Sequence, residues 1–381
     1  MAWYIKLVIL LFMKNLVDLY TEKRTEGKAL EICFSDMKCN MNCAYCYGDH
    51  KNRKFNNSFS LNKSFLSDEF SKIDKNIISN IHLWGGELTF NENELRDTVV
   101  LVKNFFPETP LHVVTNGLLL PKWTDFFIDN KISIGISHDG PGQKYRGFNF
   151  LESAEHNEAI KALFDAGLFR KFKTVLHNKN CSTKNIIDYF SQYSEKIDRK
   201  VGCDVLLISP NSLSENSFIF KSDEDKQNLY NDTVWATIDI IKNLEKDPAY
   251  LRRYYQVSDV FKVIRMMDKT FNNAPSVGIT RCDGASAIAY TSDGKRIPCH
   301  CFSEKAVINQ NVEIDASYVY KKCSKCEFAY VCGGGCAANT NKELDLYCEY
   351  AYVKHKAIDD TITSIKDNND LRITDDGTNL R

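Results

Sequence analysis

Residues 29–46 read ALEICFSDMKCNMNCAYC, a β-prone run followed at once by closely spaced cysteines. Cys39, Cys43 and Cys46 form a C-x3-C-x2-C triplet, with Tyr45 directly before the last cysteine. A structural zinc site usually takes four ligands, commonly as two C-x2-C pairs, so the triplet fits zinc poorly. Three thiolates on one loop can instead reach one face of an iron–sulfur cluster and leave one metal position without a protein ligand.

Further β-prone runs alternate with helix-like segments after this loop. The runs cover residues 78–84, 111–116, 131–137, 172–177 and 204–209, and the helix-like segments lie near 60–74, 91–105, 121–129, 153–167 and 183–195. Strands separated by helices predict βαβ units and a parallel sheet. Six units are fewer than the eight of a closed barrel, so we expect an α/β fold with a partial, TIM-like (β/α)6 barrel. The cysteine triplet then lies at the carboxyl ends of the strands, where such folds carry their sites.

The composition narrows the class of protein. The chain has 381 residues with 49 Lys+Arg against 50 Asp+Glu, a balance that offers no footprint for nucleic acid and no polybasic membrane anchor. The apolar run at residues 7–13 is too short to span a bilayer and lacks a signal-peptide cleavage site. Because many of the 14 cysteines cluster at short spacings, we interpret most of them as metal ligands in a reducing compartment and expect a soluble, cytoplasmic protein.

The chain divides into five segments that differ in composition and in hydrophobic pattern. We expect an N-terminal extension (1–26), the partial barrel (27–215), bridging helices (216–275), a cysteine-rich domain (276–350) and a C-terminal helix and tail (351–381). The bridging segment is helical in pattern, with a break at Asp247-Pro248, and a last helix-like stretch covers 349–366. Residues 278–348 hold eight cysteines and little periodicity, as expected where metal organises the fold.

The triplet, with an aromatic residue before its last cysteine, resembles the signature of the radical SAM superfamily. Further segments at the ends of the expected strands resemble that family, namely Gly85-Gly86-Glu87, Thr115-Asn116-Gly117 and Ser137-His138-Asp139-Gly140. The resemblance implies that Cys39, Cys43 and Cys46 hold a 4Fe–4S cluster, whose fourth iron is chelated by S-adenosylmethionine (SAM). It also implies a set of residues that line the SAM site or its rim: Tyr45, Gly85, Gly86, Glu87, Asn116, Ser137, Asp139, Arg146, Asn178 and Ser209.

Within that set the resemblance suggests individual roles. Glu87 would bind the methionine ammonium group, and Arg146 would meet the SAM carboxylate. Ser137 and Asp139 would contact the ribose or the substrate.

The C-terminal cysteines resemble the SPASM extension of radical SAM enzymes, which binds two auxiliary 4Fe–4S clusters. By this resemblance the outer cluster takes Cys323, Cys326, Cys332 and Cys348, and the inner one takes Cys282, Cys299 and Cys336. Cys301 is a candidate for the missing inner ligand; otherwise one iron is open to solvent or substrate. A zinc ribbon is the alternative for this segment. Three cysteines outside both groups are interpreted as packing residues, namely Cys33, Cys181 and Cys203.

The resemblance implies that SAM is cleaved reductively to a 5′-deoxyadenosyl radical, which abstracts hydrogen from a peptide substrate. The first hypothesis is a maturase of ribosomally synthesised peptides that forms a cyclophane, C–C or thioether crosslink. Its partners would be a precursor peptide and a low-potential electron donor of the flavodoxin or ferredoxin type. Only 38 residues precede Cys39, so a leader-binding module is not expected there, and a separate leader-binding protein is an option.

Two alternatives stay open. Formylglycine formation of the sulfatase-maturing kind would need a base where this chain has His300, which with Asp139 is a candidate catalytic residue. A non-catalytic iron–sulfur electron carrier is the other alternative, although it would have no need for the Gly-Gly-Glu motif or for the polar strand ends.

Overall fold

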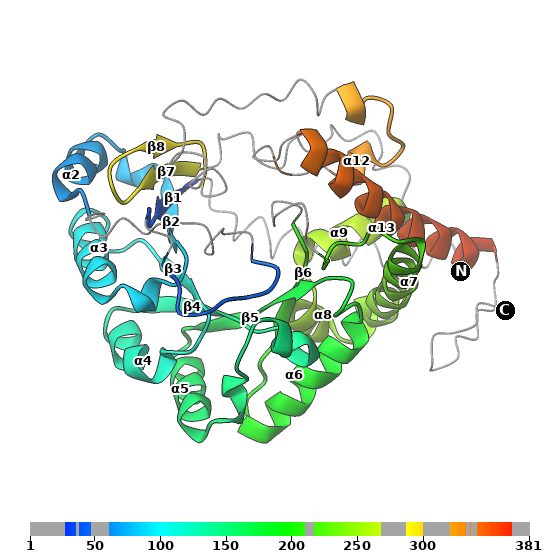
Figure 1. Cartoon of the computed structure of the whole chain (residues 1–381), viewed down its shortest axis with the longest axis horizontal. Coiled ribbons are helices and arrows are strands. Elements are labelled where there is room, and N and C mark those ends of the chain that lie inside the picture. The colour runs from blue at the N-terminus through cyan, green and yellow to red at the C-terminus, as the bar shows by residue number, and fades with distance from the viewer. Residues whose placement is uncertain are drawn as a thin grey trace.

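The strands form one sheet with helices along one side in a computed structural model (Figure 1), which describes residues 27–35, 38–46, 61–209, 217–267, 287–299, 321–332, 336 and 341–367. The sheet has eight strands in the order β6-β5-β4-β3-β2-β1-β7-β8. Its first six strands pair in parallel along the chain, which confirms the expected βαβ units. They are β1 (Lys28–Cys33), β2 (Ile78–Trp84), β3 (Leu111–Thr115), β4 (Ile132–Ser137), β5 (Phe169–Leu176) and β6 (Cys203–Leu207).

Helices connect these strands and cover the outer side of the sheet (Figure 1). They are α2 (Lys63–Ser71), α3 (Glu92–Phe105), α4 (Leu120–Asp129), α5 (Ala154–Asp165) and α6 (Thr183–Ile197). Side chains alternate along each strand, so every second residue faces these helices. Phe172 of β5, for example, stacks on Phe190 of α6 with ring centroids 4.6 Å apart. This helix-facing layer forms the main hydrophobic core.

A hairpin from the cysteine-rich segment extends the barrel sheet. Strand β7 (Ala287–Thr291) pairs in parallel with β1, and β8 (Arg296–Ile297) pairs antiparallel with β7. The sequence predicted no strand in the cysteine-rich segment, so this hairpin was missed. Gly294 turns the hairpin with a φ of +99°, and a Cβ there would lie 2.9 Å from the Asn62 side chain. The sequence signal was weak because a two-residue strand has no measurable periodicity.

The bridging segment forms three helices: α7 (Asp223–Lys246), α8 (Pro248–Tyr254) and α9 (Val257–Met267). The first break falls at Asp247-Pro248 as expected, because proline cannot continue a helix but suits its first position. The C-terminal helix α13 (Asn341–Asp367) begins earlier than the expected 349 and lies beside α7 (Figure 1). Tyr350 in α13 donates a hydrogen bond of 2.9 Å to the carbonyl of Ile208, which joins this helix to the end of β6.

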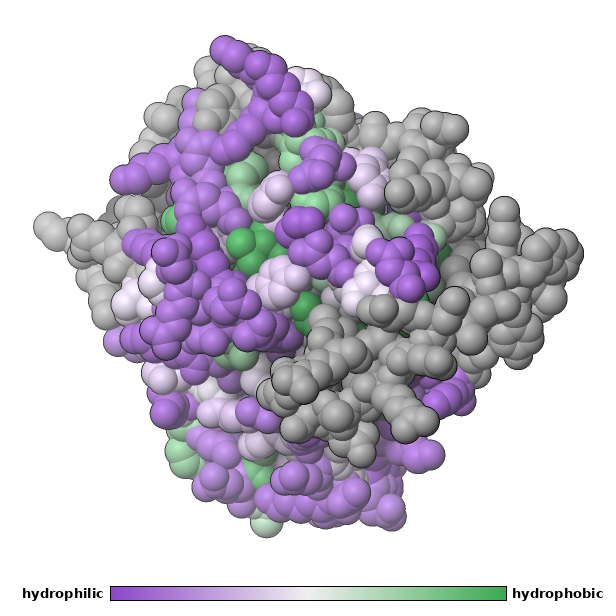
Figure 2. Space-filling model, turned by 90° about the vertical axis from the view of Figure 1, so that its right-hand side faces the viewer, coloured by the Kyte–Doolittle hydropathy of each residue, from purple (hydrophilic) through white to green (hydrophobic). Residues whose placement is uncertain are grey.

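The surface is predominantly polar where α13 and α7 reach it. Figure 2 shows this face, on which hydrophilic residues predominate and hydrophobic ones show only in small patches between them. Among the described helices, none is long and apolar enough to cross a membrane. The apolar run at 7–13, together with Cys282, His300 and Cys301, lies outside the described residues.

Candidate functional site

The three cysteines of the triplet lie on a loop that two other segments hold in place. Cys39, Cys43 and Cys46 are all partly exposed, while Tyr45 between them is buried. The loop is fixed by backbone bonds, since Glu87 N–H donates to the Lys38 carbonyl at 2.6 Å and Ala44 N–H donates to the Tyr145 carbonyl at 2.8 Å. The thiols are thus presented at the carboxyl ends of the strands, next to the segments that follow β2 and β4.

Glu87 of the Gly-Gly-Glu segment is a buried carboxylate with a complete set of donors. Its Oε1 accepts hydrogen bonds from the Thr89 hydroxyl at 2.5 Å and the Thr115 hydroxyl at 2.6 Å, and its Oε2 accepts from the Asn116 N–H at 2.6 Å. Burial raises the pKa of Glu87, and these hydrogen bonds oppose the rise because they favour the charged form. The Gly-Gly-Glu and Thr-Asn-Gly segments are therefore joined through one carboxylate.

Asn116 points its side chain at the cysteine loop. Its Nδ2 donates to Cys39 Sγ at 3.7 Å and to Asn40 Oδ1 at 2.7 Å. The backbone N–H of Met41 also donates to Cys39 Sγ, at 3.4 Å. N–H donors directed at a cysteine sulfur stabilise the thiolate, which is the form that binds metal.

Tyr45, Asp139 and Arg146 form a buried cluster behind the loop. The Tyr45 hydroxyl donates to Asp139 Oδ2, and Arg146 donates to the Tyr45 oxygen at 3.1 Å. Asp139 is fully buried and also accepts from the Val175 N–H at 3.0 Å. Burial raises the pKa of Asp139, and the nearby guanidinium of Arg146 lowers it. The same guanidinium lowers the pKa of the Cys43 thiol, against a larger rise from burial.

An aromatic group under the loop was not anticipated from the sequence. The rings of Tyr45, Tyr145, His177 and Phe218 pack together, with centroids between 5.0 and 5.8 Å apart. His177 Nε2 is buried without a hydrogen-bond partner, and burial lowers the pKa of His177 to about 4. No local pattern pointed to this group, because its members come from four separate segments.

The remaining residues predicted to line the SAM site or its rim are placed as follows. Ser137 ends β4 and is partly exposed, and Ser209 is exposed just after β6. Asn178 lines a separate polar pocket of about 490 Å³ between the start of α6 and α7, together with Asn180 and Asp232. Gly85 and Gly86 follow β2, where a Cβ on Gly85 would lie 3.0 Å from Leu88 and 3.1 Å from Phe34.

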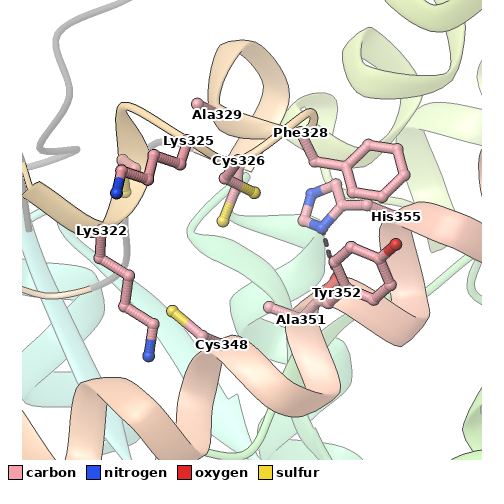
Figure 3. Close-up of a pocket in the computed structure, with 11 residues that line it drawn as sticks. Lys322, Lys325, Cys326, Phe328, Ala329, Cys348, Ala351, Tyr352 and His355 are labelled. Atoms are coloured by element: carbon pink, nitrogen blue, oxygen red, sulfur yellow. Dashed lines mark hydrogen bonds between the residues drawn. The ribbon is translucent and has the colours of Figure 1, made fainter.

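Four C-terminal cysteines line one pocket. It has a volume of about 220 Å³, and its cysteines are Cys323, Cys326, Cys332 and Cys348. Figure 3 shows the sulfurs of Cys326 and Cys348 pointing toward the space between α13 and the facing segment. Burial, with a contribution from the other three thiols, raises the pKa of Cys323 to about 11. The four cysteines expected by resemblance for the outer cluster therefore face one another.

His355 forms the inner wall of this pocket (Figure 3). It lies seven residues after Cys348 in α13, on the same face of the helix. Its Nδ1 lies 2.5 Å from the Ala351 carbonyl, and its ring stacks on Phe328. Burial lowers the pKa of His355 to about 3, so the ring is neutral at pH 7.

The cysteines expected for the inner cluster are only partly described. Cys299 is buried after β8 and close enough to Cys33 for its charge to raise the pKa of the Cys33 thiol, in addition to burial and Glu31. Cys336 is partly exposed. Cys33 and Cys203 are fully buried, and Cys181 is partly exposed and packs against the main core.

Both cysteine groups supply the thiolate ligands that iron–sulfur clusters take. Within the described residues, no group of three His, Cys, Asp or Glu side chains lies close enough to hold one metal ion. The N–H donors on Cys39 fit this chemistry as well, since cluster sulfurs accept hydrogen bonds.

Comparison with known proteins gives one family and a set of similar folds. Residues 37–180 match the model of the radical SAM superfamily. The solved structure titled "Native anSMEcpe with bound AdoMet" is 16% identical, with a TM-score of 0.57 over 90% of this chain and 100% of that chain. Streptococcus suis SuiB bound to S-adenosylmethionine is 16% identical, with a TM-score of 0.55 over 86% of this chain and 77% of that chain.

A second SuiB structure contains the precursor peptide SuiA and is 15% identical, with a TM-score of 0.53 over 86% of this chain and 75% of that chain. No curated protein matches the sequence. At these identities the solved structures establish a shared fold. The family match covers the cysteine loop, the Gly-Gly-Glu segment and the ends of β3 and β4, so the part of the chain that is similar to the radical SAM superfamily contains the candidate site.

Proposed function

We propose that this chain is a radical SAM enzyme that modifies a peptide. The observation that carries the proposal is the convergence of Cys39, Glu87, Asn116 and the Tyr45–Asp139–Arg146 cluster at one end of the parallel strands. The similar folds support a peptide substrate, since anSMEcpe was solved with the Kp18Cys peptide and SuiB with its precursor peptide.

Each part of the site would have its own task. Cys39, Cys43 and Cys46 would hold a 4Fe–4S cluster, and this cluster with SAM would supply a 5′-deoxyadenosyl radical for hydrogen abstraction. Asn116 would stabilise Cys39 as a thiolate through its amide. Arg146, buried beside the loop with an unpaired Nε, has a donor left for the SAM carboxylate.

Glu87 would attract the SAM ammonium group through its charge, because its lone pairs already face internal donors. Ser137, at the end of β4, would contact the ribose or the substrate.

The C-terminal cysteines would hold two auxiliary clusters. Cys323, Cys326, Cys332 and Cys348 would bind the outer cluster, and the shared pocket supports this assignment. Cys282, Cys299 and Cys336 would bind the inner cluster, with Cys301 as its fourth ligand or with one iron open. These clusters would accept the electron when the substrate radical is oxidised, or would ligate the substrate, and an external flavodoxin or ferredoxin would reduce the enzyme.

Within this proposal the reaction is a crosslink in a ribosomally synthesised peptide, with a cyclophane, C–C or thioether bond as the product. Recognition of the leader would use the barrel edge, the bridging helices or a separate protein. Formylglycine formation is the second candidate, and the similarity to anSMEcpe, solved with peptides bound, is the observation that favours it.

Anaerobic incubation of the reconstituted chain with SAM and dithionite tests the proposal. We expect 5′-deoxyadenosine from the wild type and none from Cys43→Ala. Cys203→Ala, which removes a buried cysteine outside both groups, is the matched control and should keep the activity. If the reconstituted wild type forms no 5′-deoxyadenosine, the enzyme is not of this class and the electron-carrier alternative stands.

A further inference from the structure

The inner face of the sheet carries charge next to the candidate site. Phe172 of β5 faces the helices, where it stacks on Phe190 of α6. Because side chains alternate along a strand, Lys171 and Lys173 on either side of Phe172 face the other way. Lys173 Cε would lie 3.6 Å from a Cβ placed on Gly135 of β4, so the lysine chain extends across that glycine.

The two lysines share one carboxylate. Lys171 Nζ lies 2.7 Å from Asp204 Oδ1, and Lys173 Nζ lies 2.5 Å from Asp204 Oδ2. No other carboxylate in the described part of the chain pairs with either ammonium group, so the trio has a net charge of +1. The lysine side chains are 24% and 31% exposed, which leaves ammonium donors accessible on a partly buried face.

The trio of Lys171, Lys173 and Asp204 lies nearer to the start of the strands than the cysteine loop does. Lys173 pairs in register with Ser137 of β4, and Val175, two residues later, donates to Asp139 of the buried cluster. At about 3.3 Å per residue, Lys173 lies roughly 10 Å and Lys171 roughly 16 Å before the end of β5 at Leu176. A peptide that lies along this face toward the candidate site would contact both lysines.

We propose that Lys171 and Lys173 bind a carboxylate of the substrate peptide, an Asp or Glu side chain close to the residue that is modified. This inference rests on the proposed function and specifies the substrate class. A single net positive charge on a partly buried face calls for an anionic partner. Leu206, 37% exposed and paired in register with Val175, adds an apolar contact on the same face for the neighbouring residue of the peptide.

The carboxylate of SAM has the same chemistry, and the position of the trio distinguishes the two sources. Arg146 already lies at the cysteine loop, where the SAM carboxylate is expected, whereas Lys173 and Lys171 lie three and five residues before the end of β5. We therefore assign the lysines to the peptide.

Two short peptides test the proposal, acetyl-Gly-Leu-Glu-Gly-amide and its Gln counterpart. Their affinities are measured by calorimetry under anaerobic conditions on the reconstituted chain with SAM present. We expect the wild type to bind the Glu peptide about tenfold more tightly than the Gln peptide, the effect of one charge-assisted contact. Lys173→Gln and Lys171→Gln should each remove most of that preference.

Asp204→Asn separates this role from a structural one. It removes the competing carboxylate and raises the net charge of the trio, so the preference for the Glu peptide should increase several-fold, an outcome that misfolding cannot produce. Lys184→Gln, in the exposed Lys184–Asp188 pair of α6, is the control and should leave both affinities unchanged.

The outcomes separate this inference from the proposed function. Equal affinities of the wild type for the two peptides, or no binding of either, would overturn the inference even if 5′-deoxyadenosine is formed. Weaker SAM binding in Lys173→Gln, without a change in peptide preference, would assign the lysines to SAM and also overturn it. A further outcome is that no 5′-deoxyadenosine forms although the wild type prefers the Glu peptide and the lysine variants lose that preference. In that case the proposed function fails and the carboxylate site stands.

Discussion

The hydroxyl group of Tyr45 donates a hydrogen bond to the carboxylate of Asp139, which ties the cysteine loop to the end of β4. Asp139 in turn accepts from the Val175 backbone N–H, so one fully buried carboxylate connects the loop with two strands. The loop geometry therefore depends on a side chain 94 residues away in the sequence.

Tyr45→Phe should loosen the cysteine loop. It takes one donor from the buried Asp139 carboxylate, and such a loss costs about 1–3 kcal/mol of unfolding free energy. We expect a chelator to remove iron from the reconstituted variant faster than from the wild type. Tyr230→Phe, which removes a Tyr–Asp hydrogen bond of 2.9 Å to Asp360, is the matched control. Equal rates of iron loss in the wild type and Tyr45→Phe would contradict the prediction.

Glu87→Gln should destabilise the chain although it changes the shape of the side chain very little. Each carboxylate oxygen accepts from a backbone N–H, so the amide NH2 of Gln would meet the N–H of Thr89 or of Asn116 in either orientation. We expect unfolding free energy to fall by about 2–3 kcal/mol, measured by urea titration. Glu92, whose side chain is 41% exposed, pairs with Lys122 and Arg96, and its Gln variant should change stability by less than about 1 kcal/mol. Similar losses in the two variants would contradict the argument.

The strands and the first cysteine group could be predicted from the sequence because their signals are local. β-prone runs between amphipathic helices gave six strands in the right order, with bounds that agree within three residues. The parallel arrangement then placed Glu87, Asn116 and Asp139 at one end of the sheet without further information.

The features that were missed depend on contacts between distant segments. The pairing of β7 with β1 joins residues more than 250 apart. The aromatic group around His177 and the trio around Asp204 likewise become visible only when the strand register is known. From the sequence alone, Lys171 and Lys173 would be assigned to a solvent-exposed face. The contact of Phe172 with α6 shows instead that both lysines lie on the inner face of the sheet.

Buried His138 should make stability depend on pH. Its Nδ1 accepts from the Gly140 N–H at 3.0 Å, and burial lowers the pKa of His138 to about 3. The unfolded chain takes up this proton near pH 6.5, so the stabilisation is complete above that pH and is lost as pH falls toward 3. Between pH 7 and pH 5 the expected loss is about 2 kcal/mol from this group.

Urea titrations of the wild type and His138→Gln at both pH values measure that loss. The variant should show a smaller drop in unfolding free energy between pH 7 and pH 5, by about the same 2 kcal/mol. The comparison uses the difference between two pH values, so any uniform destabilisation by the substitution cancels. An identical drop in both proteins would show that His138 is not held neutral by the fold.

The double substitution Cys326→Ala/Cys348→Ala should remove one cluster without disturbing the others. Both residues line the pocket together with Cys323 and Cys332, so the double variant leaves two thiols there, fewer than the three of the N-terminal triplet. A 4Fe–4S cluster at this pocket predicts about four fewer irons per chain after anaerobic reconstitution. Cys203→Ala provides the matched control, since Cys203 is buried in β6 and should leave the iron content unchanged. Zinc in place of iron at this pocket, or no change in iron in the double variant, would favour the zinc-ribbon alternative over an auxiliary cluster.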